Sequence, residues 1–155
     1  MTITSRPRLF LDSNVLVGAF AATWGLDKAL VSLCAARICR LVLADPVREE
    51  VERNLALVAS RHAPQTHVLF SEAFHEFLRL ADPETVPFPS FAEVQASRHL
   101  IRHQADLPVL LAACKAHPDW LLTNNTHHFT ASVASQTGLR IATPAQFFRT
   151  LAAKL

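Results

Sequence analysis

Short apolar runs alternate with longer amphipathic stretches along this chain. The runs RLFLD (8–12), LVLA (41–44) and DWLLT (119–123) are apolar at three or four successive positions, as expected of strands that are buried on both faces. Residues 140–142 give a shorter fourth strand. Because strands alternate with helical stretches, the order predicts an α/β fold with a mainly parallel sheet, in a single domain over residues 1–155.

The helical stretches are bounded by recognisable start signals. Asp45-Pro46 and Thr143-Pro144 each place a capping side chain before a proline in the first turn. Ser90, with Glu93 three residues later, has the spacing of a capping box. The prolines around residues 86–89 predict a brief extended stretch. The expected helices cover about residues 15–20, 27–38, 45–58, 66–81, 90–103, 106–116 and 144–154.

Composition narrows the class of protein further. Half of the 155 residues are hydrophobic, which disfavours disorder, and a net charge of +2 does not by itself argue for nucleic acid binding. Cys34, Cys39 and Cys114 form no C-x-x-C pair, which indicates free thiols and a cytoplasmic protein. The opening residues have no signal-peptide pattern, and no run approaches the ~20 apolar residues of a membrane span, so no membrane contact is expected.

Short polar or acidic residues stand at four of the predicted element junctions. Asp12 ends the first strand, Glu50 lies early in the helix after the second, Asp106 opens a helix, and Asn124 and Asn125 follow the third strong strand. Taken singly, such residues are usually helix caps or turn formers. In a parallel sheet, however, the carboxyl ends of the strands share one edge, where ligands bind. Carboxylates that meet there repel one another unless a cation is present, and Mg²⁺ or Mn²⁺ fits oxygen ligands.

Helix geometry distinguishes Glu50 from its neighbour Glu49. At about 100° per residue, Glu50 lies roughly 60° from Val47, on the flank of the apolar stripe that also contains Val51. Glu49 lies roughly 160° from both valines and points away from the core. Glu50 is therefore predicted to face the sheet edge, and Glu49 to face water.

Histidine and serine residues offer weaker candidates for chemistry. His127 and His128 are adjacent, so their side chains point apart, and a helix cap or an exposed position is favoured over shared metal binding. His99 and His103 can share a helix face but lack the H-E-x-x-H pattern, which favours a surface pair, with His103 close to the predicted cleft. Ser13 stands in no G-x-S-x-G elbow, and no phosphate-binding glycine motif occurs.

Four segments together resemble a known family. They are LFLDSNVLV, LADPVREEVERNL, ADLPVLLAACKAHPDWLLTNNTHHF and IATPAQFF. In this order they resemble the PIN-domain ribonucleases, most closely the stand-alone bacterial toxins related to VapC. The resemblance extends from about Arg8 to Phe148 and is weakest over residues 60–100. It implies a three-layer α/β/α sandwich with a parallel sheet.

The resemblance also implies site residues. Asp12, Glu50 and Asp106 would be the metal-binding acids of a Mg²⁺- or Mn²⁺-dependent endoribonuclease, and Asn14 would support Asp12. The family's fourth acid lies in a T-x-D turn after a strand. Here that turn is Thr123-Asn124-Asn125, so Thr123 would support the site and Asn125 would stand in the metal site where Asp is usual.

The implied function is hydrolysis of RNA phosphodiester bonds by the toxin of a toxin–antitoxin pair. RNA would be the substrate, an antitoxin protein the partner, and a homodimer the assembly. Arg98, Arg102 and Lys115 are candidates for holding the phosphate backbone. Because Asn125 replaces an acid, the alternative is a weakened or inactive RNA- or protein-binding module of the same fold. A receiver-like regulatory domain is a more distant alternative.

Overall fold

The centre of the molecule is a five-stranded sheet. The protein is described by a computed structural model, which places residues 5–154. The strands stand in the order β3-β2-β1-β4-β5, and every neighbouring pair is parallel. This arrangement confirms the predicted α/β fold with a parallel sheet. The strands are β1 (Arg8–Leu11), β2 (Arg40–Ala44), β3 (Glu84–Val86), β4 (Trp120–Leu122) and β5 (Ile141–Ala142).

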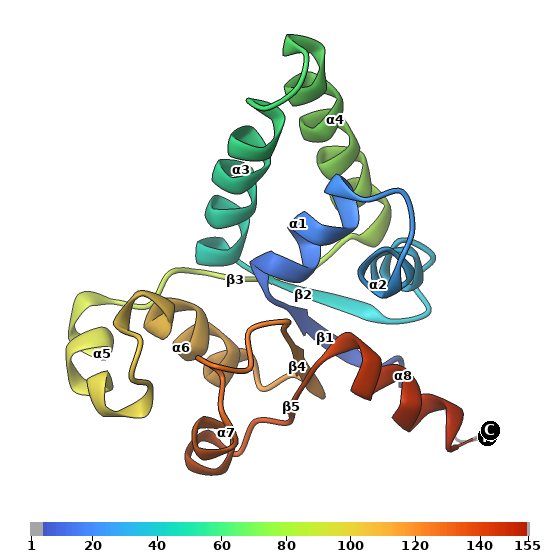
Figure 1. The fold of residues 1–155 in the computed structure, drawn as a ribbon. Coiled ribbons are helices and arrows are strands. Elements are labelled where there is room, and N and C mark those ends of the chain that lie inside the picture. The colour runs from blue at the N-terminus through green and yellow to red at the C-terminus, as the bar shows by residue number, and fades with distance from the viewer. Residues whose placement is uncertain (1–4, 155) are drawn as a thin grey trace.

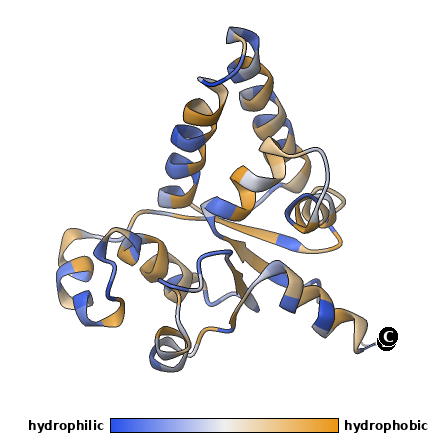
Figure 2. Ribbon diagram, viewed as in Figure 1, coloured by the Kyte–Doolittle hydropathy of each residue, from blue (hydrophilic) through white to orange (hydrophobic). Residues whose placement is uncertain are grey.

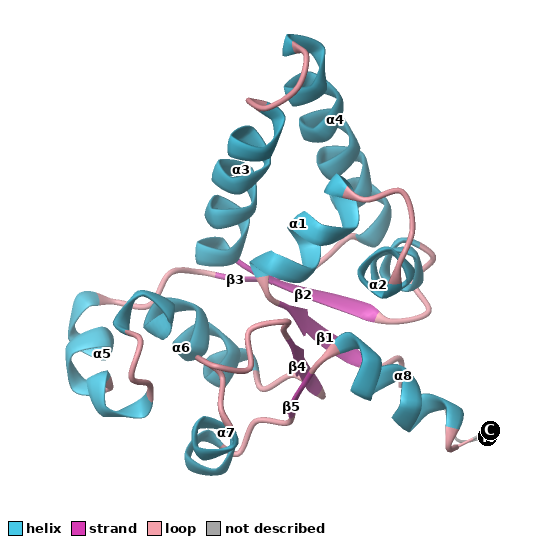
Figure 3. Ribbon diagram, in the orientation of Figure 1, coloured by secondary structure: helices cyan, strands magenta, loops and turns pink. Residues whose placement is uncertain are grey.

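Helices cover both faces of the sheet and give the three layers that were expected (Figures 1 and 3). In Figure 1, α1 to α4 lie above the sheet, where α3 and α4 form a long hairpin, and α5 to α7 lie below it. The last helix, α8, packs against α2. The helices are α1 (Ser13–Ala21), α2 (Leu26–Ala35), α3 (Asp45–Ala59), α4 (Pro64–Ala81), α5 (Phe91–Ala96), α6 (Leu107–Ala116), α7 (Ala131–Thr137) and α8 (Pro144–Ala152), with short 3-10 turns at Arg98–Leu100 and Gln104–Asp106.

The core lies between the sheet and the helices on each side. Leu9, Phe10 and Leu11 of β1 are fully buried, as the continuous apolar run predicted. In Figure 2 the strands are mostly hydrophobic, whereas hydrophobic and polar residues alternate along the helices. All three cysteines are free thiols, as predicted. Burial raises the pKa of Cys34 to about 12, so this thiol is inert at neutral pH.

The strand order creates a switch point between β1 and β4. From β1 the chain moves outward to β2 and β3, then returns to the other side of β1 for β4 and β5. The connection that follows β1 and the one that follows β4 lead to opposite sides of the sheet, and they leave a crevice between them, beyond the carboxyl ends of these two strands. The order also differs from the 2-1-3-4-5 order of receiver-like folds, which removes that alternative.

Several element boundaries differ from the sequence predictions. Asp45 makes no capping hydrogen bond, because α3 begins at Asp45 itself with Ala44 in the capping position. The helix opened by Ser90 ends at Ala96 rather than near residue 103, because Ile101 turns back into the core. The short helix α7 was not expected, and β3 overlaps the extended stretch predicted around residues 86–89 only at its last residue. By contrast, Thr143 makes the predicted cap, within a full capping box.

No single helix within residues 5–154 has the length and hydrophobicity to cross a membrane. Only α1 and α2 taken together reach the required length, and they are bent by 98° at the break between them. Their apolar residues pack into the core, which accounts for their hydrophobic character.

The amino edge of the sheet is held by a paired cluster of charges. Arg8, the first residue of β1, donates two hydrogen bonds to Glu84 of β3 at 2.6 and 3.0 Å, and it also donates to the carbonyls of Ala116 and His117 at the end of α6. These hydrogen bonds lower the pKa of Glu84. Arg8 therefore ties β1 to the edge strand and to the end of α6.

Candidate metal centre

A cleft opens at the carboxyl edge of the sheet, at the switch point between β1 and β4. Its volume is about 560 Å³. No Lys or Arg lines it within the described part of the chain, although three carboxylates do. The lining residues are Asp12, Ser13, Asn14, Val17, Gly18, Glu50, Asn54, Leu57, Val58, Asp106 and Asn125. The structure thus brings together Asp12, Asn14, Glu50, Asp106 and Asn125, which are more than a hundred residues apart at the extremes.

Asp12 lies at the base of this cleft, where β1 ends and α1 begins. Its side chain is 5% exposed and accepts three hydrogen bonds: from the Ser13 N–H at 2.8 Å, from Asn14 Nδ2 at 3.0 Å and from Thr123 Oγ1 at 2.7 Å. Its backbone carbonyl accepts from the first turn of α1. The turn role considered for Asp12 is therefore real, but the carboxylate still faces the cleft.

Burial raises the pKa of Asp12 to about 6. Desolvation is the main cause, and the charges of Glu50 and Asp106 raise the pKa further. The hydrogen bonds from Thr123 and Ser13 act in the opposite direction, since they favour the charged form. The cleft therefore holds a carboxylate at an energetic cost that a cation would offset.

Glu50 and Glu49 occupy the positions that helix geometry predicted. Glu50 is partly buried and lines the cleft, on the side of α3 that faces Asp12. Glu49 is exposed and lies 4.0 Å from Arg53, one turn further along the helix. Asn54, one turn after Glu50, also lines the cleft and was not anticipated from the sequence. Its position at Glu50 plus four could have shown that it shares this face.

Asp106 enters the cleft from the start of α6. It occupies the capping position but makes no side-chain capping hydrogen bond, so the simple capping explanation is wrong for this residue. Its Oδ2 atom is buried and has no hydrogen bond of acceptable geometry. The carboxylate is therefore available to the cleft and to the side chains next to it.

The turn after β4 places its two asparagines differently. Thr123 is fully buried, and its hydroxyl accepts from the Asn125 N–H at 3.0 Å while it donates to Asp12. Asn124 points away from the cleft, and its amide donates to Asp27 of α2. Asn125 lines the cleft, in the place where the family resemblance would put an acid.

Two histidines surround Asp106. His128 Nδ1 lies 2.6 Å from Asp106 Oδ2, and His103 Nδ1 lies 3.1 Å from the same oxygen. The two rings stack with centroids 4.0 Å apart and an interplanar angle of 13°. His127 and His128 both line the cavity beside Arg102, and His128 pairs with His103 across the fold. Only the tertiary structure shows this pairing, because the two residues come from different loops.

The basic residues proposed from the sequence do not form one ribbon. Arg102 lines a second cavity of about 580 Å³, next to His103 and His128. Arg98 is exposed and hydrogen bonds to Gln104. Lys115 lies near the end of α6, which Arg8 ties to the amino edge of the sheet. Lys115 is therefore far from the cleft, because α6 runs from the carboxyl edge of the sheet back to the amino edge.

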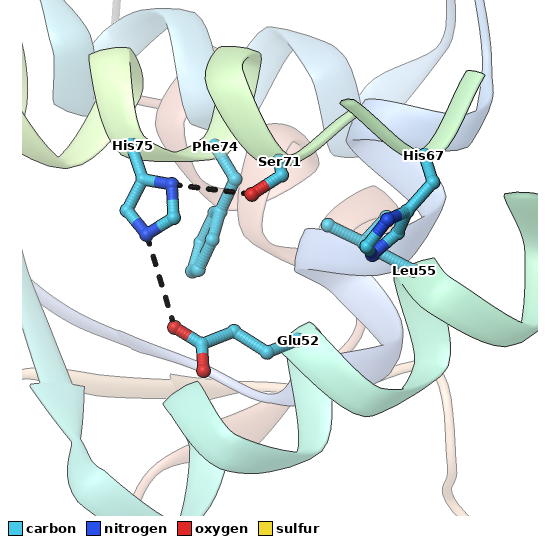
Figure 4. A pocket seen from close by; sticks show the side chains of 6 residues that line it. All are labelled: Glu52, Leu55, His67, Ser71, Phe74 and His75. Atoms are coloured by element: carbon cyan, nitrogen blue, oxygen red, sulfur yellow. Dashed lines mark hydrogen bonds and ion pairs between the residues drawn. The ribbon is translucent and has the colours of Figure 1, made fainter. Parts of the chain in front are cut away.

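A further cavity between α3 and α4 contains a serine, a histidine and a glutamate (Figure 4). Ser71 Oγ lies 3.4 Å from His75 Nδ1, and His75 Nε2 lies 4.0 Å from Glu52 Oε1. The second distance is too long for a hydrogen bond. Ser71 also lies inside α4, where backbone N–H groups are engaged in the helix and cannot form an oxyanion hole. This arrangement is not a nucleophilic triad.

Comparisons with known proteins identify the fold alone. No protein-family model matches the sequence, and no curated protein matches it significantly. Among solved structures, FitAcB from Neisseria gonorrhoeae is 16% identical with a TM-score of 0.59, over 88% of this chain and 97% of that one. VapBC2 from Rickettsia felis, solved with a DNA fragment from its promoter, has the same identity, TM-score and share of this chain, and 98% of its own chain is covered. This chain therefore has the fold of a protein chain present in these two structures.

Proposed function

We propose that this protein is a metal-dependent endoribonuclease. The observation that carries the proposal is the convergence of Asp12, Glu50 and Asp106 in one cleft that no Lys or Arg lines within residues 5–154. Three carboxylates in such a cleft match the ligand chemistry of Mg²⁺ or Mn²⁺. Burial is the main cause of the raised pKa of Asp12, and the nearby charges of Glu50 and Asp106 raise it further, so a cation in the cleft would favour the charged form.

In this proposal Asp12, Glu50 and Asp106 hold the metal. A divalent ion there would supply an activated water and charge stabilisation for phosphodiester hydrolysis. Asn14 and Thr123 fix the orientation of the Asp12 carboxylate through their hydrogen bonds at 3.0 and 2.7 Å. Asn125 presents a neutral amide to the same cleft, which reduces the negative charge available to a second ion.

RNA is the substrate that the family resemblance suggests. The neighbouring cavity with Arg102, His103 and His128 offers donors for phosphate oxygens beside the acidic cleft. We infer further that the protein is the toxin of a toxin–antitoxin pair, with an antitoxin protein as partner. The sequence resemblance to VapC relatives and the structural likeness to a VapBC2 chain support this assignment together.

The alternative is a binding module of the same fold that has lost catalysis. The feature in its favour is Asn125, whose amide contacts His128 and carries no charge. An amide binds hard cations more weakly than a carboxylate, so a second metal position would be the first to be lost.

The decisive experiment measures cleavage of a mixed single-stranded RNA pool with Mg²⁺ or Mn²⁺. Wild type, Asp12→Asn and Asn125→Asp are compared. Metal-dependent cleavage by wild type that Asp12→Asn abolishes is the expected result. Cleavage only by Asn125→Asp would instead identify a decayed nuclease and support the binding module. Absence of cleavage in all three folded proteins would contradict the nuclease assignment for these substrates.

A further inference from the structure

The ring Nδ1 atom of His128 has two polar neighbours, Asn125 Nδ2 and Asp106 Oδ2, and it cannot form a hydrogen bond with both. Asn125 Oδ1 accepts a hydrogen bond from the backbone N–H of His128 at 3.3 Å. This orients the Asn125 amide so that its Nδ2 lies 2.8 Å from the ring Nδ1 of His128. An amide nitrogen is a donor, so Nδ1 must offer its lone pair to it. The same Nδ1 lies 2.6 Å from Asp106 Oδ2, which is also an acceptor. Two lone pairs at this distance repel each other.

A proton on Nδ1 would remove the repulsion from Asp106 but create one with the Asn125 amide. A proton on Nδ1 could serve Asp106, but the N–H would then face the N–H of the Asn125 amide. The Oδ2 atom is buried without any hydrogen bond of acceptable geometry, and no Lys or Arg pairs with Asp106 in residues 5–154. An unsatisfied buried carboxylate oxygen costs free energy that native proteins rarely leave uncompensated.

His103 supplies a third lone pair from another loop. Its Nδ1 lies 3.1 Å from Asp106 Oδ2, and its ring stacks on that of His128. The two ring nitrogens and the carboxylate oxygen all lie within 4.8 Å of one another. Metal bonds of about 2.0–2.2 Å at tetrahedral angles separate ligand atoms by roughly 3.4 Å, so His103 and above all His128 must move away from Asp106 Oδ2 by less than about 1 Å when an ion binds. Because the two rings are nearly parallel, the half-exposed His103 ring must turn out of the stack for both Nδ1 lone pairs to point at one ion.

We propose that His103, His128 and Asp106 bind a borderline divalent ion, such as Zn²⁺, beside the acidic cleft. Two imidazoles and one carboxylate are a ligand set for such ions, and three protein ligands leave a position open for water. The set differs from the all-oxygen cleft, which suits Mg²⁺ or Mn²⁺, although Asp106 belongs to both. Because Asp106 is shared, an ion on the histidines would lie next to the site proposed for hydrolysis.

Co²⁺ provides a test that does not depend on RNA cleavage. In a nitrogen-containing site of four or five ligands, Co²⁺ absorbs strongly in the visible range, whereas all-oxygen octahedral Co²⁺ absorbs weakly. Wild type titrated with Co²⁺ should develop the strong absorption. His128→Gln and His103→Gln should each weaken Co²⁺ affinity by at least about tenfold and lose that absorption.

His127→Gln is the matched control, because His127 adjoins His128 and lines the neighbouring cavity without a hydrogen bond or ion pair to Asp106 in the described structure. Its Co²⁺ spectrum should equal that of wild type, and circular dichroism should show that all variants are folded. A wild type with no strong absorption, or a His128→Gln protein that retains it, would overturn the proposal.

Asp12→Asn separates the two metal proposals. This variant should lose RNA cleavage if the proposed function is correct, but should keep the histidine-dependent Co²⁺ absorption. Failure of the cleavage experiment would therefore leave this site standing. Loss of the absorption on changing His127 as much as on changing His128 would contradict it.

Discussion

Acidic residues at the two edges of the sheet have opposite surroundings. At the amino edge, Glu84 receives two hydrogen bonds from Arg8 and lies 3.6 Å from Arg40, so its pKa is lowered. At the carboxyl edge, burial raises the pKa of Asp12 to about 6, and the charges of Glu50 and Asp106 add to this shift, while no Lys or Arg among the described residues lines the cleft to offset it. The first edge is complete without any ligand, whereas the second lacks positive charge.

This contrast separates charges that stabilise the fold from charges that the fold holds at a cost. Ion pairs at the amino edge connect β1, β3 and the end of α6 and require nothing further. Like charges gathered without a partner cost stability and are found where a ligand or reaction needs them. The direction of a pKa shift therefore distinguishes the two edges better than the presence of acidic residues, which both contain.

The largest expected effect distinguishes two adjacent glutamates. Glu50→Gln should lower metal-dependent RNA cleavage by at least about 100-fold, because a proposed metal ligand is lost. Glu49→Gln should change cleavage by less than about twofold, since Glu49 faces Arg53 and water. Initial rates at saturating Mg²⁺ or Mn²⁺ provide the measurement. Equal losses in the two variants would contradict the assignment of the cleft.

The next effect concerns pH and Asp12. Its folded pKa of about 6 exceeds the unfolded value of 3.8, so the protonated form stabilises the fold at low pH, and this contribution is lost as pH rises through about 6. Without divalent ions, wild type should lose on the order of 2 to 3 kcal/mol relative to Asp12→Asn between about pH 4 and pH 7. Urea unfolding of both proteins at each pH measures this difference.

Added metal should change the stability of only one of these two proteins. At about pH 7, Mg²⁺ should stabilise wild type and have little effect on Asp12→Asn, because binding to the native state raises its stability. A stability difference that stays flat between about pH 4 and pH 7 would show that Asp12 carries no charge penalty.

A smaller effect is expected from the hydroxyl that holds Asp12. Thr123→Val keeps the shape of a buried side chain but removes the 2.7 Å hydrogen bond to Asp12. Affinity for Mn²⁺ should fall about tenfold, as is usual when a residue that orients a ligand is lost. Calorimetric titration gives the affinity. Thr130→Val is a suitable control, because Thr130 caps α7. A similar loss of Mn²⁺ affinity in Thr130→Val would contradict an orienting role for Thr123.

The smallest functional effect should come from the amino edge. Arg8→Gln should destabilise the protein by about 1–2 kcal/mol, because hydrogen bonds between charged groups are lost at a partly exposed site. Its Mn²⁺ affinity should stay within about twofold of wild type. Thermal and urea unfolding measure stability, and calorimetry measures binding. A marked loss of Mn²⁺ affinity would mean that the two edges are coupled.

Most of the fold, and the three acids that line the cleft, could be predicted from the sequence. Continuous apolar runs placed β1, β2 and β4, because strands buried on both faces must be hydrophobic throughout. The 100° helical spacing chose Glu50 over Glu49, since that angle is fixed by the backbone. By contrast, the sequence predicted only an extended stretch among prolines near β3, because a three-residue edge strand is recognised by its hydrogen bonds to β2 and not by its own residues.

The contacts between side chains at the sheet edge, by contrast, came from the tertiary structure. It separated Asn125 from Asn124 through the hydrogen bond of Asn124 to Asp27, and it placed Lys115 at the wrong edge for the site. It also brought His103 and His128 onto one oxygen of Asp106, although they belong to loops 25 residues apart in the sequence. Local patterns report the period of a helix or strand, whereas these contacts depend on how loops at the sheet edge converge, which no local period encodes.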